Sequence, residues 1–177
     1  MRKPTLIDRV ERHRGRVILA MTVRLRAPDN EVYEHDLVRH PGAAAIVPID
    51  SVGRVCLVRQ YRLGVDEFLW EVPAGKLDRN EPPDACAVRE LREETGITAA
   101  RWTPLGRFLP APAILTEVIH LYLAEELEIG PPAPEADEDL EVRWVDLDEA
   151  IDQVATGEID DGKTALALLR ARRRRRP

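Results

Sequence analysis

The sequence predicts an α+β fold in which one main domain follows a small N-terminal β subdomain. Apolar residues alternate with other residues from 17 to 25, the period of a half-buried strand, and further short apolar runs follow. One helical pattern, over residues 82–95, lies between predicted strands, and two more come near the end of the chain. The length of 177 residues, with 33% charged residues, fits one globular domain with an appendage.

The N-terminal part is predicted to form a β-hairpin. Residues 17–25 and 32–38 are the two strands, and Pro28-Asp29-Asn30 is a turn signal between them. Because an isolated hairpin is only marginally stable in water, it has to pack on the main domain or on another subunit. We therefore expect a β subdomain over residues 1–39 and the main domain over 40–170.

The main domain is predicted to combine short strands with three helices. Apolar runs predict strands at 43–49, 55–59, 68–72, 102–109, 118–124 and 141–145. After the helix at 82–95, two more helices are expected over 147–155 and from 164 to about 174. The acidic, proline-rich segment 130–139 predicts a loop. Residues 171–177 are expected to form a basic, disordered tail.

Charge and composition argue against several classes of protein. The net charge of −6 argues against a general nucleic-acid binder, although the arginine tail could bind an anionic partner. No apolar run reaches the roughly 20 residues of a membrane span, and the charged N-terminal stretch lacks a signal-peptide pattern, which favours the cytoplasm. Cys56 and Cys86 form no CxxC pair, so we expect two buried reduced thiols and no zinc site.

The helix at 82–95 concentrates negative charge on one side. Glu90, Glu93 and Glu94 are three and four residues apart and share a face, where like charges repel by about 0.2–0.5 kcal/mol per pair. Gly96 suits the left-handed position that ends a helix. A solvated acidic face explains this cluster, and a bound divalent cation is the alternative. The neighbouring apolar arc, predicted to pack on a sheet, consists of Ala85, Ala87, Val88 and Leu91.

The spacing around this helix resembles the signature of the Nudix hydrolase superfamily at every defined position. The matching residues are Gly75, then Glu81, then Arg89-Glu90-Leu91, Glu93-Glu94 and Gly96-Ile97. The resemblance implies an α/β/α sandwich on a mixed sheet, and hydrolysis of a nucleoside diphosphate linked to another group. It implies Mg²⁺ as the cofactor, with Mn²⁺ as a substitute. The metal ligands that it implies are the backbone carbonyl of Ala74 and the carboxylates of Glu90, Glu93 and Glu94.

Other residues of the motif have structural roles by the same resemblance. Gly75 would let the chain turn tightly beside the metal. Arg89 would form ion pairs, with Glu81 among its partners, that hold the loop and the glutamates in place. Gly96 and Pro112 are also expected to be structural.

Segments outside the motif resemble the ADP-ribose pyrophosphatase branch. They are Val58–Arg62, Glu71–Asp78, Ile159–Thr164 and Pro112, although Ala111 and Ala113 depart from the serine and glycine usual beside that proline. The resemblance implies cleavage of ADP-ribose to AMP and ribose 5-phosphate by a homodimer that exchanges its N-terminal sheets. A nucleotide-sugar pyrophosphatase, for example one acting on GDP-mannose, is the alternative. A ligand-sensing Nudix domain without catalysis is an alternative from another class.

Two substrate contacts and a general base follow from the same resemblance. Arg62 would contact the phosphate or ribose region of the substrate, and Glu117 would bind the terminal ribose hydroxyls. The general base is expected in the acidic loop, with Glu138 as the first choice before Glu141 and Glu135. Glu93 could serve as the base instead.

Overall fold

A computed structural model describes residues 2–131 and 140–175 of the chain. Contacts divide the chain into two compact units, namely Met1–Gly42 with Leu109–Val118, and Ala43–Phe108 with Ile119–Pro177. Glu135 and Glu138, two of the candidate bases, lie outside the described residues. None of the helices in the described ranges is both long and apolar enough to span a bilayer.

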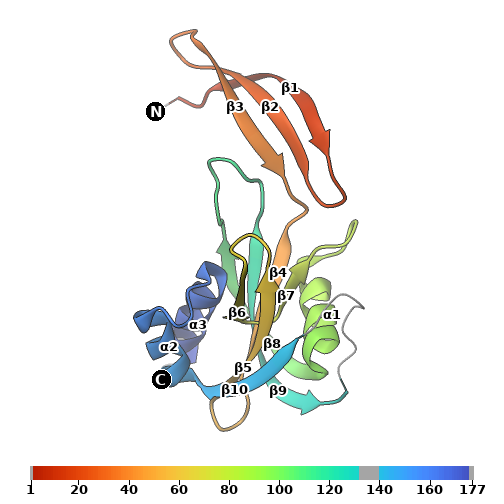
Figure 1. Ribbon diagram of the computed structural model, residues 1–177, viewed down its shortest axis with the longest axis vertical. Coiled ribbons are helices and arrows are strands. Elements are labelled where there is room, and N and C mark those ends of the chain that lie inside the picture. Colours follow the sequence, from red (N-terminus) through yellow and green to blue (C-terminus); the bar gives the residue numbers. More distant parts are fainter. Residues whose placement is uncertain (1, 132–139, 176–177) are drawn as a thin grey trace. The chain divides into compact units, whose positions relative to one another are not determined.

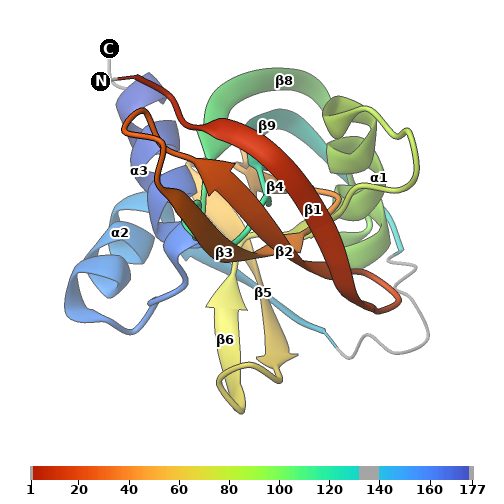
Figure 2. The ribbon, with the colours of Figure 1, turned by 90° about the horizontal axis from the view of Figure 1, so that it is seen from above.

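The first unit contains a three-stranded antiparallel sheet with β2 at its centre (Figure 2). Its strands are β1 (Thr5–Arg14), β2 (Leu19–Arg26) and β3 (Val32–Arg39). The predicted hairpin is confirmed as β2 and β3, whereas β1 was not predicted. Strand β1 is hard to predict because half of its residues are charged and nearly all of its side chains are exposed. The segment 109–118 joins this unit by backbone hydrogen bonds to Val38, one from Val38 N–H to Ile114 O at 2.8 Å.

Within its described residues, the second unit contains two sheets and three helices (Figure 1). The mixed sheet has the order β7-β4-β9-β8, with β4 (Ala43–Pro48) parallel to β9 and the other pairs antiparallel. Its other strands are β7 (Ala74–Lys76), β8 (Ile97–Phe108) and β9 (Ile119–Ile129). The antiparallel sheet β10-β5-β6 consists of β5 (Arg54–Arg62), β6 (Glu67–Glu71) and β10 (Glu141–Asp146). The helices are α1 (Pro83–Thr95), α2 (Leu147–Thr156) and α3 (Gly162–Arg175).

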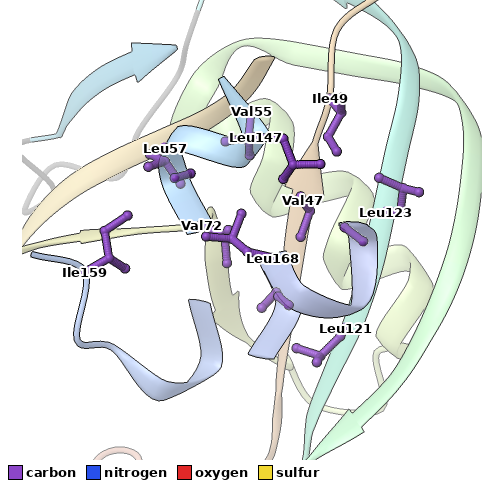
Figure 3. Close-up of a cluster of buried hydrophobic side chains, with 14 of the residues drawn as sticks. Val47, Ile49, Val55, Leu57, Val72, Leu121, Leu123, Leu147, Ile159 and Leu168 are labelled. Atoms are coloured by element: carbon purple, nitrogen blue, oxygen red, sulfur yellow. The ribbon is translucent and has the colours of Figure 1, made fainter. Parts of the chain in front are cut away.

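Strand β4 separates two apolar cores, because its successive side chains point to opposite faces. Ala45 and Val47 belong to a core that also contains Leu147 of α2 and Leu168 of α3 (Figure 3). Ala44 and Ile46 belong to a second core, which contains the α1 residues Cys86, Ala87 and Leu91. The mixed sheet therefore lies between α1 on one face and α2 with α3 on the other, which confirms the predicted α/β/α sandwich.

The buried side of α1 differs from the predicted one. The structure exposes Ala85 and Val88, which were expected to pack on the sheet, and buries Glu90 and Glu94 instead. The helix turns these carboxylates inward because strand β7 and Arg89 offer them hydrogen-bond donors. The expectation is therefore confirmed for Ala87 and Leu91 and wrong for Ala85 and Val88, because a face chosen by hydrophobicity alone cannot include glutamates.

Helix α3 continues through most of the segment expected to be a disordered tail. It ends at Arg175, and Ala171 is buried in the core. Arg172 Nη2 donates to Asp148 Oδ2 at 3.0 Å, and Arg175 Nε lies 3.5 Å from Glu125 Oε1. Arginine is a good helix former and is favoured in the last turn by the helix dipole. The prediction of disorder over residues 171–177 is therefore wrong for 171–175.

Candidate active site

Strand β7 and helix α1 lie side by side and bring Gly75 against a buried carboxylate (Figure 1). A Cβ built on Gly75 would lie only 1.8 Å from Glu90 Oε1, and the Glu90 side chain is among the buried ones. The backbone of Gly75 is extended, since it belongs to β7 and its φ is not positive. The glycine is therefore required for the close approach of Glu90, and not for the tight turn that the sequence suggested.

Glu94 is held at the end of the same helix face. Its Oε2 accepts a hydrogen bond from the Ala74 N–H at 3.1 Å, and the residue is 3% exposed. The backbone of β7 thus contacts both buried glutamates of α1, Ala74 binding Glu94 and Gly75 making room for Glu90. The C-cap Gly96, with φ of 71°, ends the helix, as the sequence predicted.

Arg89 binds three carboxylates at once. Its Nε and Nη2 donate to Glu81 at 2.9 and 2.8 Å, while Nη1 donates to Glu90 at 2.8 Å and to Glu93 at 3.0 Å. Nη2 also donates to the Lys76 carbonyl at 3.2 Å. These contacts raise the pKa of Arg89, the bond to Glu81 most strongly, so it stays charged. One guanidinium therefore offsets the mutual repulsion of the α1 glutamates.

Glu81 fixes the loop that leads into α1. Its carboxylate also accepts from the Asp78 N–H at 3.0 Å, and the Glu81 N–H returns a bond to the Asp78 carbonyl. The paired Arg89 guanidinium lowers the pKa of Glu81 to about 2. A permanently charged pair thus joins the loop to the helix.

Both cysteines are buried free thiols, as expected, and both lie close to the α1 glutamates. Burial raises the pKa of the Cys56 thiol to about 12, with a further contribution from the Glu94 charge. Burial likewise raises the pKa of Cys86 to about 12, with Glu90 contributing. Neither thiol is a thiolate at neutral pH, which excludes both as nucleophiles.

The α1 carboxylates fit a hard divalent cation by their chemistry. The predicted ligands Ala74, Glu90, Glu93 and Glu94 offer only oxygen donors, which Mg²⁺ and Mn²⁺ prefer. Within residues 2–131 and 140–175, however, no three or more His, Cys, Asp or Glu side chains form a ready-made metal cluster. Arg89 instead supplies the positive charge beside Glu90 and Glu93.

Arg62 belongs to a separate ionic cluster at the start of α3. Its Nε and Nη2 bind both oxygens of Glu71, at 2.8 and 2.5 Å, and Glu71 is 2% exposed. This bond raises the pKa of Arg62, and the charges of Glu94 and Asp161 add to the effect. Lys163 Nζ donates to Glu71 Oε2 at 2.5 Å and to Asp161 Oδ2 at 3.0 Å. Sequence reasoning assigned no role to Glu71 or Lys163, although both lie in segments matching the ADP-ribose pyrophosphatase branch.

The remaining predicted residues belong to other elements of the fold. Glu117 belongs to the first unit, where its Oε1 lies 3.2 Å from His40 Nδ1, and Pro112 occupies an exposed turn of that unit. Glu141 accepts from Arg59 Nη1 at 3.4 Å and is paired with Arg59 in the sheet. Strand alternation puts Glu141 on the face of this sheet opposite to Glu71.

Comparisons with known proteins agree on one family. The model of the NUDIX domain matches residues 38–168. The chain is 37% identical to an ADP-ribose pyrophosphatase of Bacillus subtilis (strain 168) over 156 residues, covering 87% of this chain and 84% of the relative. It is 39% identical to an ADP-ribose pyrophosphatase of Mycobacterium tuberculosis over 150 residues, covering 83% and 72%.

Relatives named for another activity are also similar. The chain is 33% identical to a GDP-mannose pyrophosphatase of Klebsiella pneumoniae over 164 residues, covering 86% of this chain and 82% of that protein. A crystal structure of an ADP compounds hydrolase matches with a TM-score of 0.86 at 22% identity, covering 98% of this chain and 94% of the other. At 22% identity this structural match shows a shared fold and nothing about the activity of this chain.

Proposed function

The chain belongs to the NUDIX domain family, and we propose that it hydrolyses the diphosphate of ADP-ribose to give AMP and ribose 5-phosphate. The observation that carries the proposal is the burial of Glu90 and Glu94 against Gly75 and Ala74. Burying two carboxylates on one helix face costs free energy unless positive charge and hydrogen bonds compensate it, and a bound divalent cation would supply such charge. The two relatives named as ADP-ribose pyrophosphatases support the choice of substrate.

The cation in this proposal is Mg²⁺, with Mn²⁺ as a substitute, held by Glu90, Glu93, Glu94 and the Ala74 carbonyl. When bound, such an ion neutralises diphosphate charge and lowers the pKa of a coordinated water. The chain's own contribution is placement, since β7 fixes Glu94 by a backbone hydrogen bond and Arg89 fixes Glu90 and Glu93.

Substrate binding is assigned to Arg62 and Glu117. Arg62 carries a charge held in one orientation by Glu71, which suits recognition of a phosphate group. Glu117 would accept hydrogen bonds from the terminal ribose hydroxyls. Glu138 remains our first choice as general base, before Glu141 and Glu135, and Glu93 is the alternative within α1.

Assembly and location remain predictions. We propose a homodimer in which the sheet of residues 1–39 is exchanged, which would cover side chains of that sheet that are exposed in the single chain. These apolar side chains include Leu6, Val10, Val32 and Tyr33. The cytoplasmic location stays a prediction.

A substrate panel tests the proposal. The chain is incubated with Mg²⁺ and ADP-ribose, GDP-mannose or other nucleotide sugars, and nucleoside monophosphate release is measured. We expect the highest kcat/KM for ADP-ribose. A preference for GDP-mannose would favour the alternative that the Klebsiella relative supports, and no hydrolysis of any substrate would favour a non-catalytic sensing domain.

A further inference from the structure

Glu71 is a buried anion placed between two cations. It ends strand β6 and is 2% exposed, so its charge requires close partners. Arg62 binds both carboxylate oxygens, and Lys163 Nζ reaches Oε2 at 2.5 Å. The Lys163 side chain is 13% exposed, so it too is largely removed from water, whereas the Arg62 side chain is 37% exposed. The charge of Glu71 is therefore divided between two partners from different elements.

This arrangement leaves one nitrogen of the Arg62 guanidinium without a bond to Glu71. Nε and Nη2 are both engaged by Glu71, so Nη1 is the remaining guanidinium nitrogen. It makes no hydrogen bond with any residue in the described part of the chain. Because the guanidinium is planar, the bidentate bond to Glu71 also fixes the direction of the Nη1 donors. A pre-oriented donor pair binds an anion without first losing side-chain freedom.

Lys163 occupies a position that local helix physics disfavours. It is the second residue of α3, where the positive end of the helix dipole repels a cation. Asp161 compensates in part, accepting from Lys163 Nζ at 3.0 Å and from the Thr164 N–H at 2.9 Å. The Thr164 hydroxyl in turn accepts from the Val72 N–H at 3.0 Å, one residue beyond Glu71. Two adjacent contacts thus connect the start of α3 to the end of β6, namely Lys163 with Glu71 and Thr164 with Val72.

From these contacts we propose that Lys163 is a positioning residue for substrate binding, acting through Glu71 on Arg62. By sharing the negative charge of Glu71, it leaves more of the Arg62 charge for the diphosphate and keeps the guanidinium in its orientation. Without Lys163, Glu71 has Arg62 as its single close cation among these groups, and that pairing competes with the substrate. The inference rests on the proposed role of Arg62 and assigns no contact between Lys163 and the substrate.

Steady-state kinetics of the full chain with ADP-ribose and Mg²⁺ test this role. Lys163→Met is expected to raise KM about 10-fold and to change kcat less than about two-fold, since binding is affected and the reacting groups are not. Lys163→Arg keeps the charge and should recover part of the loss. The matched control is Arg173→Met, which removes an exposed cation from the same helix and should leave both constants unchanged.

A double-mutant cycle separates this role from a merely structural one. In a Glu71→Gln background, where no buried charge needs sharing, Lys163→Met should change KM less than about two-fold. In this background Lys163→Met removes no partner from a charged Glu71, so an unchanged KM of the double variant relative to Glu71→Gln supports the role even if Lys163→Met alone folds poorly. An equal rise of KM in both backgrounds would overturn the proposal, as would a lower unfolding midpoint for Lys163→Met with an unchanged KM.

Calorimetric binding of ADP-ribose in the presence of EDTA distinguishes this proposal from the hydrolase assignment. If the parent chain binds ADP-ribose but does not hydrolyse it with Mg²⁺, the proposed function fails. Lys163→Met must then still weaken binding about 10-fold for the positioning role to stand. A parent chain that neither binds nor hydrolyses ADP-ribose overturns both.

Discussion

Replacing Gly75 by alanine perturbs the contact on which the proposed active site depends most directly. The new Cβ would lie 1.8 Å from Glu90 Oε1 and 1.9 Å from its Cδ, whereas ordinary contact begins at 3.4 Å. The carboxylate cannot simply rotate away, because Glu90 is 8% exposed and its Oε1 accepts from Arg89 at 2.8 Å. Either the glutamate leaves Arg89 or strand β7 moves away from α1.

Either outcome should lower both the unfolding free energy and the activity, and both quantities can be measured. Overpacking a buried site costs about 1–3 kcal/mol, so we expect Gly75→Ala to lower the unfolding free energy by that amount. A catalytic group displaced by about 1 Å can slow a reaction about 100-fold, and the clash demands at least a displacement of that order. We therefore expect kcat/KM for ADP-ribose to fall about 100-fold or more.

Urea denaturation and steady-state kinetics give the two quantities, and Gly64→Ala is the matched control. A Cβ at Gly64 meets nothing within 4 Å, and Gly64 does not have a positive φ. The control should therefore keep its stability and activity. If Gly75→Ala retained more than half of the parental kcat/KM, the placement of Glu90 could not be essential, and the reasoning would be refuted.

Three further predictions concern the same helix and its neighbours. Glu94→Gln should abolish AMP release from ADP-ribose while keeping the parental circular dichroism spectrum; turnover at the parental rate would contradict the metal-ligand role. Because burial raises the pKa of the Cys56 and Cys86 thiols to about 12, a thiol reagent at pH 8 should label both only after unfolding, so fast labelling of the native chain would be inconsistent with the structure. Arg89 lowers the pKa of Glu81 from 4.5 to about 2, so the pair stabilises the fold fully above pH 4.5 and progressively less toward pH 2. Glu81→Gln should therefore lose stability at pH 7, and its difference from the parent should shrink in acid; a difference unchanged down to pH 3 would contradict the pairing.

Much of the fold follows from local patterns. The strand β2, the turn before β3 and the proline-to-glycine limits of α1 each follow from a local pattern, and the structure confirms all three, although the buried residues Met21, Thr22 and Val23 of β2 do not alternate with exposed ones. Strand β1 could not be predicted in this way, because half of its residues are charged and nearly all are exposed, which leaves little hydrophobic alternation. Its strand conformation depends on pairing with β2, which is a contact between segments.

In the candidate site, too, local spacing predicts only some features, and the others depend on contacts between segments far apart in the sequence. The spacing of Glu90, Glu93 and Glu94 indicates their shared face, but the polarity of these residues predicts that the face points to solvent. The donors on β7, which lie outside any local spacing rule, and on Arg89 stabilise two of these glutamates in buried positions. The Lys163 contact joins residues 92 positions apart, Glu71 and Lys163, so no spacing rule within one element could reveal it.

Hydrolysis of ADP-ribose in ¹⁸O-labelled water tests the central claim most directly. If water attacks a phosphorus of the diphosphate, mass spectrometry will find one ¹⁸O atom in the phosphate of either AMP or ribose 5-phosphate, and EDTA will suppress both products. Unlabelled AMP and ribose 5-phosphate, or equal product formation in EDTA, would contradict the account.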